Sequence, residues 1–306
     1  MSIVMKKLNL TLLRTLTLAK ASQIGRPSYI SAASGLVHVG NKLYVVADDE
    51  NYLGIFPDDS DANGVLKPLF NQALPLDPVE RKAMKRDFEV LTLLPANDEH
   101  HHGALMALGS GSKKRRDKGA VISFDSHRNL HDKVKHLDLS AVYKQFRDQV
   151  DDLNVEGAVI VDNDIVLCQR GHVGTSNAII RCKADDFFSA VDGGEKKLDL
   201  NIRKYNLGEI DGIPLCFTDA TTLPDGTVIF SAAAEDTSES YLDGRCLGSA
   251  IGVITRGGEL GKIARVDKII KIEGISARVI DGRAYLTMIT DADDVAIAAQ
   301  VYSAVF

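Results

Sequence analysis

Five polar side chains recur along the chain at intervals of 54 to 67 residues, and each begins an apolar run. Four are carboxylates and one is a hydroxyl. If the fold brings these positions together, either some carboxyl pKa values rise or a cation lies among them. An all-oxygen ligand set suits a hard ion, so we expect calcium rather than zinc. The predicted metal ligands are Ser34, Glu89, Glu156, Asp219 and Glu273.

The same positions begin a repeated pattern of two apolar strands joined by a short turn, which is the kind of self-similarity that marks repeat folds. Four copies contain a two-residue turn of the type that favours β-hairpins. A fifth copy, residues 88–112, has a longer turn near Pro95-Ala96. The four two-residue turns are Gly40-Asn41, Asp162-Asn163, Asp225-Gly226 and Asp281-Gly282.

Units of three or four antiparallel strands with this repeat length predict an all-β fold, a β-propeller. Five units fit the 306 residues best, with six blades as the alternative, and residues 1–306 are expected to form one domain. The last unit has only three strands after Glu273. The N-terminal strand, predicted over Leu8–Ala19, would supply the missing outermost strand and leave no open edge there.

Charge and composition narrow the classes of partner. The chain has 42 acidic and 36 basic side chains and a net charge of −6, which argues against a nucleic-acid partner. It contains no uncharged apolar run of about 18 residues, so we expect no membrane partner. Residues 5–20 resemble a signal peptide only superficially, because polar side chains interrupt the apolar run. We therefore predict a cytoplasmic protein whose four cysteines are reduced thiols.

In a propeller, the first strand of each blade starts at one face and the second strand returns to it. Residues that end the second strands should therefore face the predicted ligands. They provide candidate catalytic residues, namely Asp48, Asp49, Arg170 and Asp236, of which any of the three aspartates could be a general base. The candidate substrate-binding residues are Lys113, Lys114, Arg115, Arg116, Arg170, His172 and Asp291.

Both groups of cations have alternative interpretations. The glycine-rich loop that carries Lys113 to Arg116 could wrap an anion, or it could be a solvated surface loop. The planar guanidinium of Arg170 suits phosphate or carboxylate, so it could bind substrate or pair with a channel carboxylate.

The segment from Ser34 to Asp49 resembles the first blade of the calcium-activated nucleotidases, the apyrase family of five-bladed propellers. That resemblance implies hydrolysis of nucleoside di- and triphosphates, with a calcium ion held at the channel centre by serine and glutamate residues. Asp219 stands where the resemblance leads us to expect a serine. The chain is also similar to the wider group of phytase-like and esterase-like bacterial propellers.

Three functions follow as hypotheses. A calcium-dependent hydrolase of phosphoesters or anhydrides would use the basic loop to bind a small anionic ligand. A calcium-dependent lactonase or esterase would use the ion without the loop. A non-enzymatic propeller would use the carboxylates or metal structurally and bind a ligand or protein, although the sequence identifies no protein partner. The fold alone does not choose among them.

Overall fold

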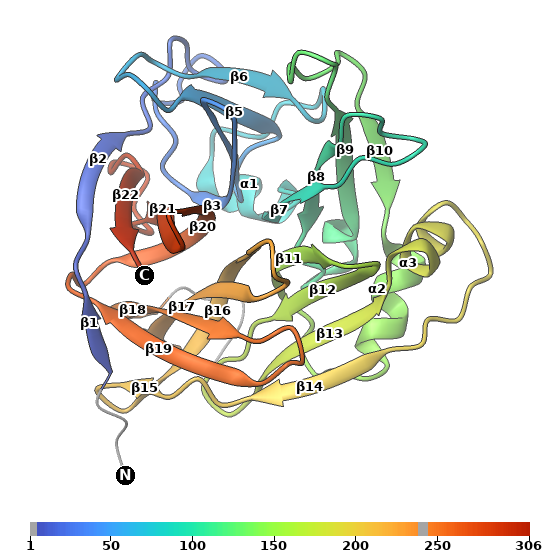
Figure 1. Cartoon of the computed structure of the whole chain (residues 1–306). Helices are drawn as coiled ribbons and strands as arrows, with labels where there is room; N and C mark the ends of the chain where they lie inside the picture. Colours follow the sequence, from blue (N-terminus) through green and yellow to red (C-terminus); the bar gives the residue numbers. More distant parts are fainter. Residues whose placement is uncertain (1–4, 238–243) are drawn as a thin grey trace.

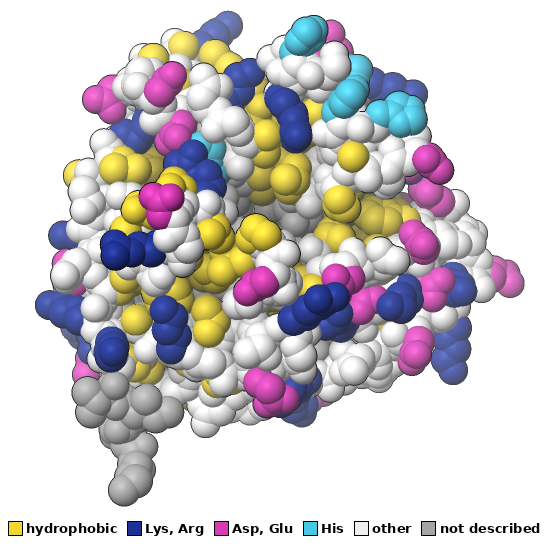
Figure 2. Space-filling view, viewed as in Figure 1, with side chains coloured by type: hydrophobic (Ala, Val, Ile, Leu, Met, Phe, Trp, Pro, Cys, Tyr) yellow, Lys and Arg dark blue, Asp and Glu magenta, His cyan; other side chains and the backbone are white. Residues whose placement is uncertain are grey.

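The computed structural model describes residues 5–237 and 244–306. Its strands form five sheets arranged around a central axis, which confirms an all-β propeller with five blades rather than six (Figure 1). Seen along that axis, the surface is hollowed at the centre, and hydrophobic side chains surround the hollow (Figure 2).

Each blade begins with its innermost strand. Blade I contains β3 (Ala33–Val39), β4 (Lys42–Ala47), β5 (Tyr52–Pro57) and β6 (Val65–Pro68). Blade II contains β7 (Phe88–Leu94), β8 (Ala104–Gly109), β9 (Lys118–Ser123) and β10 (Lys135–Asp138). Blade III contains β11 (Val155–Val161), β12 (Asp164–Gln169), β13 (Asn177–Lys183) and β14 (Asn201–Tyr205).

The last two blades recruit strands from the N-terminus. Blade IV contains β16 (Ile213–Thr222), β17 (Val228–Asp236), β18 (Arg245–Ile254) and β19 (Leu260–Val266), with β15 (Glu209–Ile210) and β1 (Lys6–Leu8) at its edges. Blade V contains β20 (Lys271–Ile280), β21 (Arg283–Asp291), β22 (Gln300–Val305) and β2 (Thr11–Thr15).

The expected ring closure is present, because β2 pairs antiparallel with β22 and completes blade V. The N-terminal segment is nevertheless two strands rather than one, since β1 pairs parallel with β19 of blade IV. Arg14 in β2 donates hydrogen bonds to the carbonyl oxygens of Pro57, Ser60 and Ala62 in blade I. The start of the chain therefore ties three consecutive blades together.

Local turn chemistry explains the hairpins. Gly40 and Asp162 both have positive φ angles, 61° and 54°, as the predicted two-residue turns between inner strands require. Apolar side chains from adjacent blades then pack into five buried clusters between the sheets. This packing fixes the blades around the axis and sets the distances between the ends of their inner strands.

Three short α-helices lie in the connections of the described chain, and a single 3-10 turn spans Lys114–Arg116. The α-helices are α1 (Pro78–Met84), between blades I and II, α2 (Ser140–Arg147), between blades II and III, and α3 (Ala184–Val191), within blade III. A helix long and apolar enough to cross a membrane is absent from residues 5–237 and 244–306. The four cysteines are free thiols; three are buried and Cys246 is partly exposed.

Candidate functional site

Every inner strand carries a β-bulge that leaves one residue out of the pairing, near the start of the strand in blades I, II, III and V and in the middle of β16 in blade IV. A bulge re-aims a side chain and breaks the regular alternation of the strand. In blades I, II, III and V the unpaired residue is the predicted ligand, namely Ser34, Glu89, Glu156 and Glu273. In blade IV it is Thr218 rather than the predicted Asp219.

Asp219 therefore has a different place from the other predicted ligands. Its side chain is fully buried and is not among the residues that line the cavity described below. Its carboxylate accepts hydrogen bonds from the backbone N–H groups of Ala220 and of Ile275 in blade V, at 2.7 and 2.8 Å. A shift of one residue along a strand moves a side chain to the other side. Asp219 therefore faces away from the cavity, and its hydrogen bond to Ile275 links blades IV and V. The bulged residue next to it, Thr218, carries a hydroxyl group.

The two bulged residues that carry a hydroxyl group, Ser34 and Thr218, make the same contact. Ser34 Oγ donates to the carbonyl oxygen of Phe88 at 2.5 Å, and Thr218 Oγ1 donates to that of Ile272 at 2.6 Å. Each acceptor directly precedes the bulged glutamate of the next blade. The hydroxyls thus position two of the three glutamates, in blades II and V.

The inner-strand ends of blades I, II, III and V line a cavity of about 250 Å³, which we call the funnel, whereas no residue of the described part of blade IV lines it. Carboxylates outnumber cationic side chains in its wall, which favours a cationic over an anionic ligand. The nine carboxylates are Asp48, Asp49, Asp87, Glu89, Glu156, Glu273, Asp291, Asp293 and Asp294. The six cations are Arg81, Lys82, Lys85, Arg116, Arg170 and Lys271.

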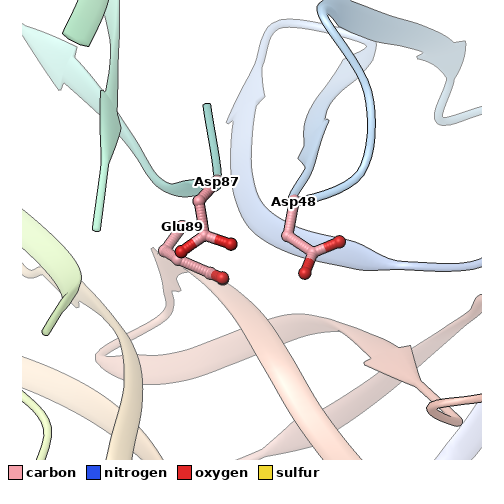
Figure 3. A group of neighbouring side chains, drawn as sticks. All are labelled: Asp48, Asp87 and Glu89. Carbon is pink, nitrogen blue, oxygen red and sulfur yellow. The ribbon is translucent and has the colours of Figure 1, made fainter. Parts of the chain in front are cut away.

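A first carboxylate cluster consists of Asp48, Asp87 and Glu89, with one oxygen of each lying within 4.8 Å of the others. Figure 3 shows Asp87 and Glu89 side by side, with Asp48 facing them from the end of β4. The ammonium group of Lys85 pairs with Asp48 and lies 2.9 Å from Asp87 Oδ1. This cluster therefore already contains a cation supplied by the chain.

The protonation of the first cluster follows from burial and from these pairs. Burial raises the pKa of Asp48 to about 6, although Lys85 opposes that shift. Burial would also raise the pKa of Asp87, but Lys85 and Arg116 together hold it below its usual value. The cluster thus combines a carboxylate that stays ionised with one that exchanges a proton near neutral pH.

A second carboxylate cluster consists of Glu89, Glu156 and Glu273, again with oxygens within 4.8 Å of one another. Glu156 Oε1 accepts a hydrogen bond from Asn154 Nδ2 at 2.6 Å, with Arg170 Nη1 at 3.4 Å. Glu156 Oε2 is buried and has no hydrogen-bond partner within the described chain. Burial, reinforced by neighbouring negative charge, raises the pKa values of Glu89 and Glu273 well above the usual range.

Two cations flank the second cluster without filling it. Arg170 pairs with Glu156 and Glu235. Of the two roles predicted for it, substrate binding or pairing with a channel carboxylate, the second is the one these contacts correspond to. Lys271 Nζ lies 2.9 Å from Glu235 Oε1 and 3.1 Å from Glu273 Oε1. Glu273 Oε1 has no partner in hydrogen-bond geometry, so we interpret this last contact as electrostatic only.

Sequence reasoning missed Lys85, Asp87 and Lys271, and at the end of the second strand of blade IV it chose Asp236 and not its neighbour Glu235. One signal could have found two of them, because Asp87 and Lys271 each lie two residues before a predicted ligand. Strand alternation would suggest that such residues point to the same side, although the bulges at Glu89 and Glu273 interrupt that alternation. Nothing local identifies Lys85, whose contacts come from the chain path after α1.

The structure separates the predicted basic loop into two parts. Lys113, Lys114 and Arg115 are exposed and do not line the funnel. Arg116 is buried, with its Nη1 2.5 Å from Asp87 Oδ2 and 2.6 Å from Ser112 Oγ. Only one member of the predicted anion-binding loop therefore reaches the funnel, where it faces a carboxylate.

The remaining predicted residues divide in the same way. Asp49 lines the funnel and pairs with Arg26 at 2.7 Å, and Asp291 lines it with a pKa raised by burial. His172 does not line the funnel, and its Nε2 lies 3.2 Å from Asp152 Oδ2. Asp236 lies at the exposed end of β17, whereas its neighbour Glu235 is buried in the ion-pair network.

Residues 29–305 match a family of unknown function, DUF6929, and the chain belongs to that family. No curated protein sequence matches it significantly. The family carries no assigned activity, so the resemblance to apyrases stays a prediction.

Solved structures that the chain resembles include glutaminyl cyclase from Myxococcus xanthus, at 10% identity and a TM-score of 0.49, covering 98% of this chain and 99% of that one. An endo-arabinase from Bacteroides thetaiotaomicron has 11% identity and a TM-score of 0.49, with coverage of 97% and 98%. A putative gluconolactonase has 11% identity and a TM-score of 0.39, with coverage of 96% and 97%. Likenesses this distant carry no argument about activity.

Proposed function

We propose that the funnel binds a divalent cation, calcium by preference, at Glu89, Glu156 and Glu273. The observation that carries this proposal is the buried, unpartnered Glu156 Oε2 within a cluster of three carboxylates. A buried polar atom without a partner is unfavourable unless an unseen ion, water or proton completes it. Carboxylate oxygens favour a hard cation, and water molecules would complete its coordination.

The first cluster is a poorer candidate for the same role. Lys85 already pairs with Asp48 and Asp87, so a metal ion there would have to displace a buried ammonium group. In the second cluster, Arg170 pairs with Glu156, and Lys271 lies beside Glu273. The cation that acts on the third glutamate, Glu89, is Lys85 of the first cluster, which opposes the rise in pKa that burial causes.

Bound protons are the competing explanation for the second cluster. The raised pKa values of Glu89 and Glu273 mean that either carboxyl could hold a proton and share it with Glu156. A protonated cluster and a cation-loaded cluster differ in one measurable respect, since only the second makes stability depend on the concentration of metal.

Hydrolysis of a small ester or lactone is the second candidate function. Asp48 supports it, because a carboxyl with a pKa of about 6 can accept a proton from water near neutral pH. A bound cation would polarise the carbonyl oxygen of such a substrate. Hydrolysis of phosphoesters or anhydrides has less support, because Arg116 and Arg170 already face protein carboxylates.

The test is thermal unfolding of chelator-stripped protein with and without millimolar calcium. We expect calcium to raise the melting temperature of the wild type and of Glu195→Gln, an exposed control. Glu156→Gln should fold but lose the calcium response, because the amide keeps the shape and removes the charge. No response of the wild type, or an equal response in Glu156→Gln, would overturn the proposal.

Activity is tested separately on calcium-loaded protein with a panel of small esters and lactones. Asp48→Asn should abolish turnover while keeping the calcium-dependent rise in melting temperature. Calcium binding without turnover of any ester would favour the non-enzymatic alternative, in which the bound ion has a structural role.

A further inference from the structure

We propose that the rim of the funnel between blades I and II docks on an anionic phospholipid surface. This docking rim comprises residues 22–26, residues 74–84 with α1, and residues 113–115. Hydrogen bonds join the three segments. Gln23 Nε2 donates to the carbonyl oxygen of Leu74 at 2.8 Å, and Arg115 Nη2 donates to that of Lys82 at 3.1 Å.

Large apolar side chains project from the docking rim into solvent. Ile24 is 98% exposed and Val79 is 78% exposed, the highest values among the large hydrophobic residues of the described chain. Leu76 and Met84, on the same rim, are also exposed. Gly25 packs so closely against Leu76 that a Cβ atom there would lie 2.9 Å from the Leu76 side chain. The loop that carries Ile24 therefore lies against the segment that leads into α1, and we call the exposed apolar side chains of these two segments the apolar strip.

Cationic side chains border this apolar strip. Lys113, Lys114 and Arg115 are exposed, and Lys82 is partly exposed beside them. Two acidic residues lie within the rim, and one of them, Asp77, is engaged as the N-cap of α1. Clusters of four or more lysines and arginines beside apolar side chains are typical of proteins that bind acidic lipid headgroups. At physiological salt, charges beyond about 8 Å are screened, so the exposed Lys113, Lys114 and Arg115 act on a nearby surface more strongly than distant acidic residues do.

The form of the strip favours a membrane over a protein partner. Its apolar side chains project singly from a loop and a short helix and do not wall a groove, whereas a protein interface is anchored by side chains that fill pockets. This inference departs from the expectation of no membrane partner, which rested on overall acidity and on the missing apolar span. It also gives a role to the exposed part of the basic loop, which the funnel does not use, and it does not depend on the proposed cation.

The test is co-sedimentation of the full chain with phosphatidylcholine vesicles that contain or lack phosphatidylserine. We expect binding only when phosphatidylserine is present. Lys113→Ala with Lys114→Ala should weaken that binding about tenfold or more, since each cation near an acidic surface contributes on the order of 1 kcal/mol. Ile24→Ser with Val79→Ser should also weaken it, with unchanged melting temperature because both side chains are exposed.

Matched controls lie at the opposite end of the blades. Lys196→Ala with Lys197→Ala removes an exposed pair of lysines between β13 and β14, and Ile280→Ser removes an exposed apolar group at the β20–β21 hairpin. Both controls should keep wild-type binding. The proposal is overturned by absent binding, by equal binding to neutral vesicles, or by equal losses in the controls. Binding to an acidic peptide without vesicle binding would assign the rim to a protein partner instead.

Discussion

The two carboxylate clusters of the funnel share Glu89, and in each the carboxylate oxygens lie within 4.8 Å of one another, but they balance their charge differently. The first cluster contains the ammonium group of Lys85, which bridges two of its carboxylates. The second leaves Glu156 Oε2 buried without a hydrogen-bond partner among residues 5–237 and 244–306. The comparison teaches that carboxylate density alone does not define a metal site. The position of the chain's own cations decides which cluster is open to an added ion.

The largest expected effect breaks the first cluster. Lys85→Met removes the cation from between the buried Asp87 and the partly exposed Asp48 and should lower the free energy of unfolding by about 3 kcal/mol. Urea denaturation measures this change, with the exposed Lys133→Met as the control. A loss below about 1 kcal/mol, within the range of surface ion pairs, would show that Lys85 is not the counter-charge of this cluster.

A second prediction concerns pH and sharpens the contrast in protonation. Because the folded pKa of Asp48, about 6, lies above the unfolded value, the folded state binds the proton more tightly. That contribution to stability is complete below the unfolded pKa and is lost as pH rises towards and through 6. In metal-free protein, the contribution of Asp48 to the free energy of unfolding should fall by about 1–3 kcal/mol over this pH range.

Asp48→Asn serves as the test of that prediction. Urea unfolding of the wild type and variant at several pH values from acid to neutral should show a smaller fall in the variant. Parallel pH profiles for the two proteins would mean that Asp48 does not titrate in this range.

A third prediction tests how the second cluster is positioned. Thr218→Val removes a fully buried hydroxyl that donates to Ile272 O, directly before Glu273. We expect a loss of about 1–2 kcal/mol in unfolding free energy and a weaker calcium response, with Thr218→Ser restoring both. A stability loss with an unchanged calcium midpoint would make Thr218 purely structural.

The smallest effect separates neighbouring residues at the end of β17. Asp236→Asn changes an exposed carboxylate and should alter stability by less than about 0.5 kcal/mol. Glu235→Gln, by contrast, weakens the pairs with Arg170 and Lys271 and should be clearly destabilising. Equal effects of the two substitutions in urea denaturation would contradict the assignment of Glu235 to the ion-pair network.

Local physics made much of the fold predictable. The apolar alternation, the two-residue turns such as Gly40-Asn41 and the repeat length are properties of short segments, and they predicted five blades and closure by the N-terminal strand. The placement of Glu89, Glu156 and Glu273 around one axis follows from the same register. A propeller requires every inner strand to start at the same face, so a repeat in sequence becomes a ring in space.

Only the tertiary structure decided how the ring is charged. The bulge in blade IV leaves Thr218, and not Asp219, out of the strand pairing, and Thr218 contacts the residue before Glu273 and does not line the funnel. Arg170 pairs with Glu235, 65 residues away along the chain, and no local pattern records such a contact. The sequence by itself therefore determined the blades and the convergence of carboxylates. Packing between blades decided which carboxylates receive a cation from the chain and which remain open to an added one.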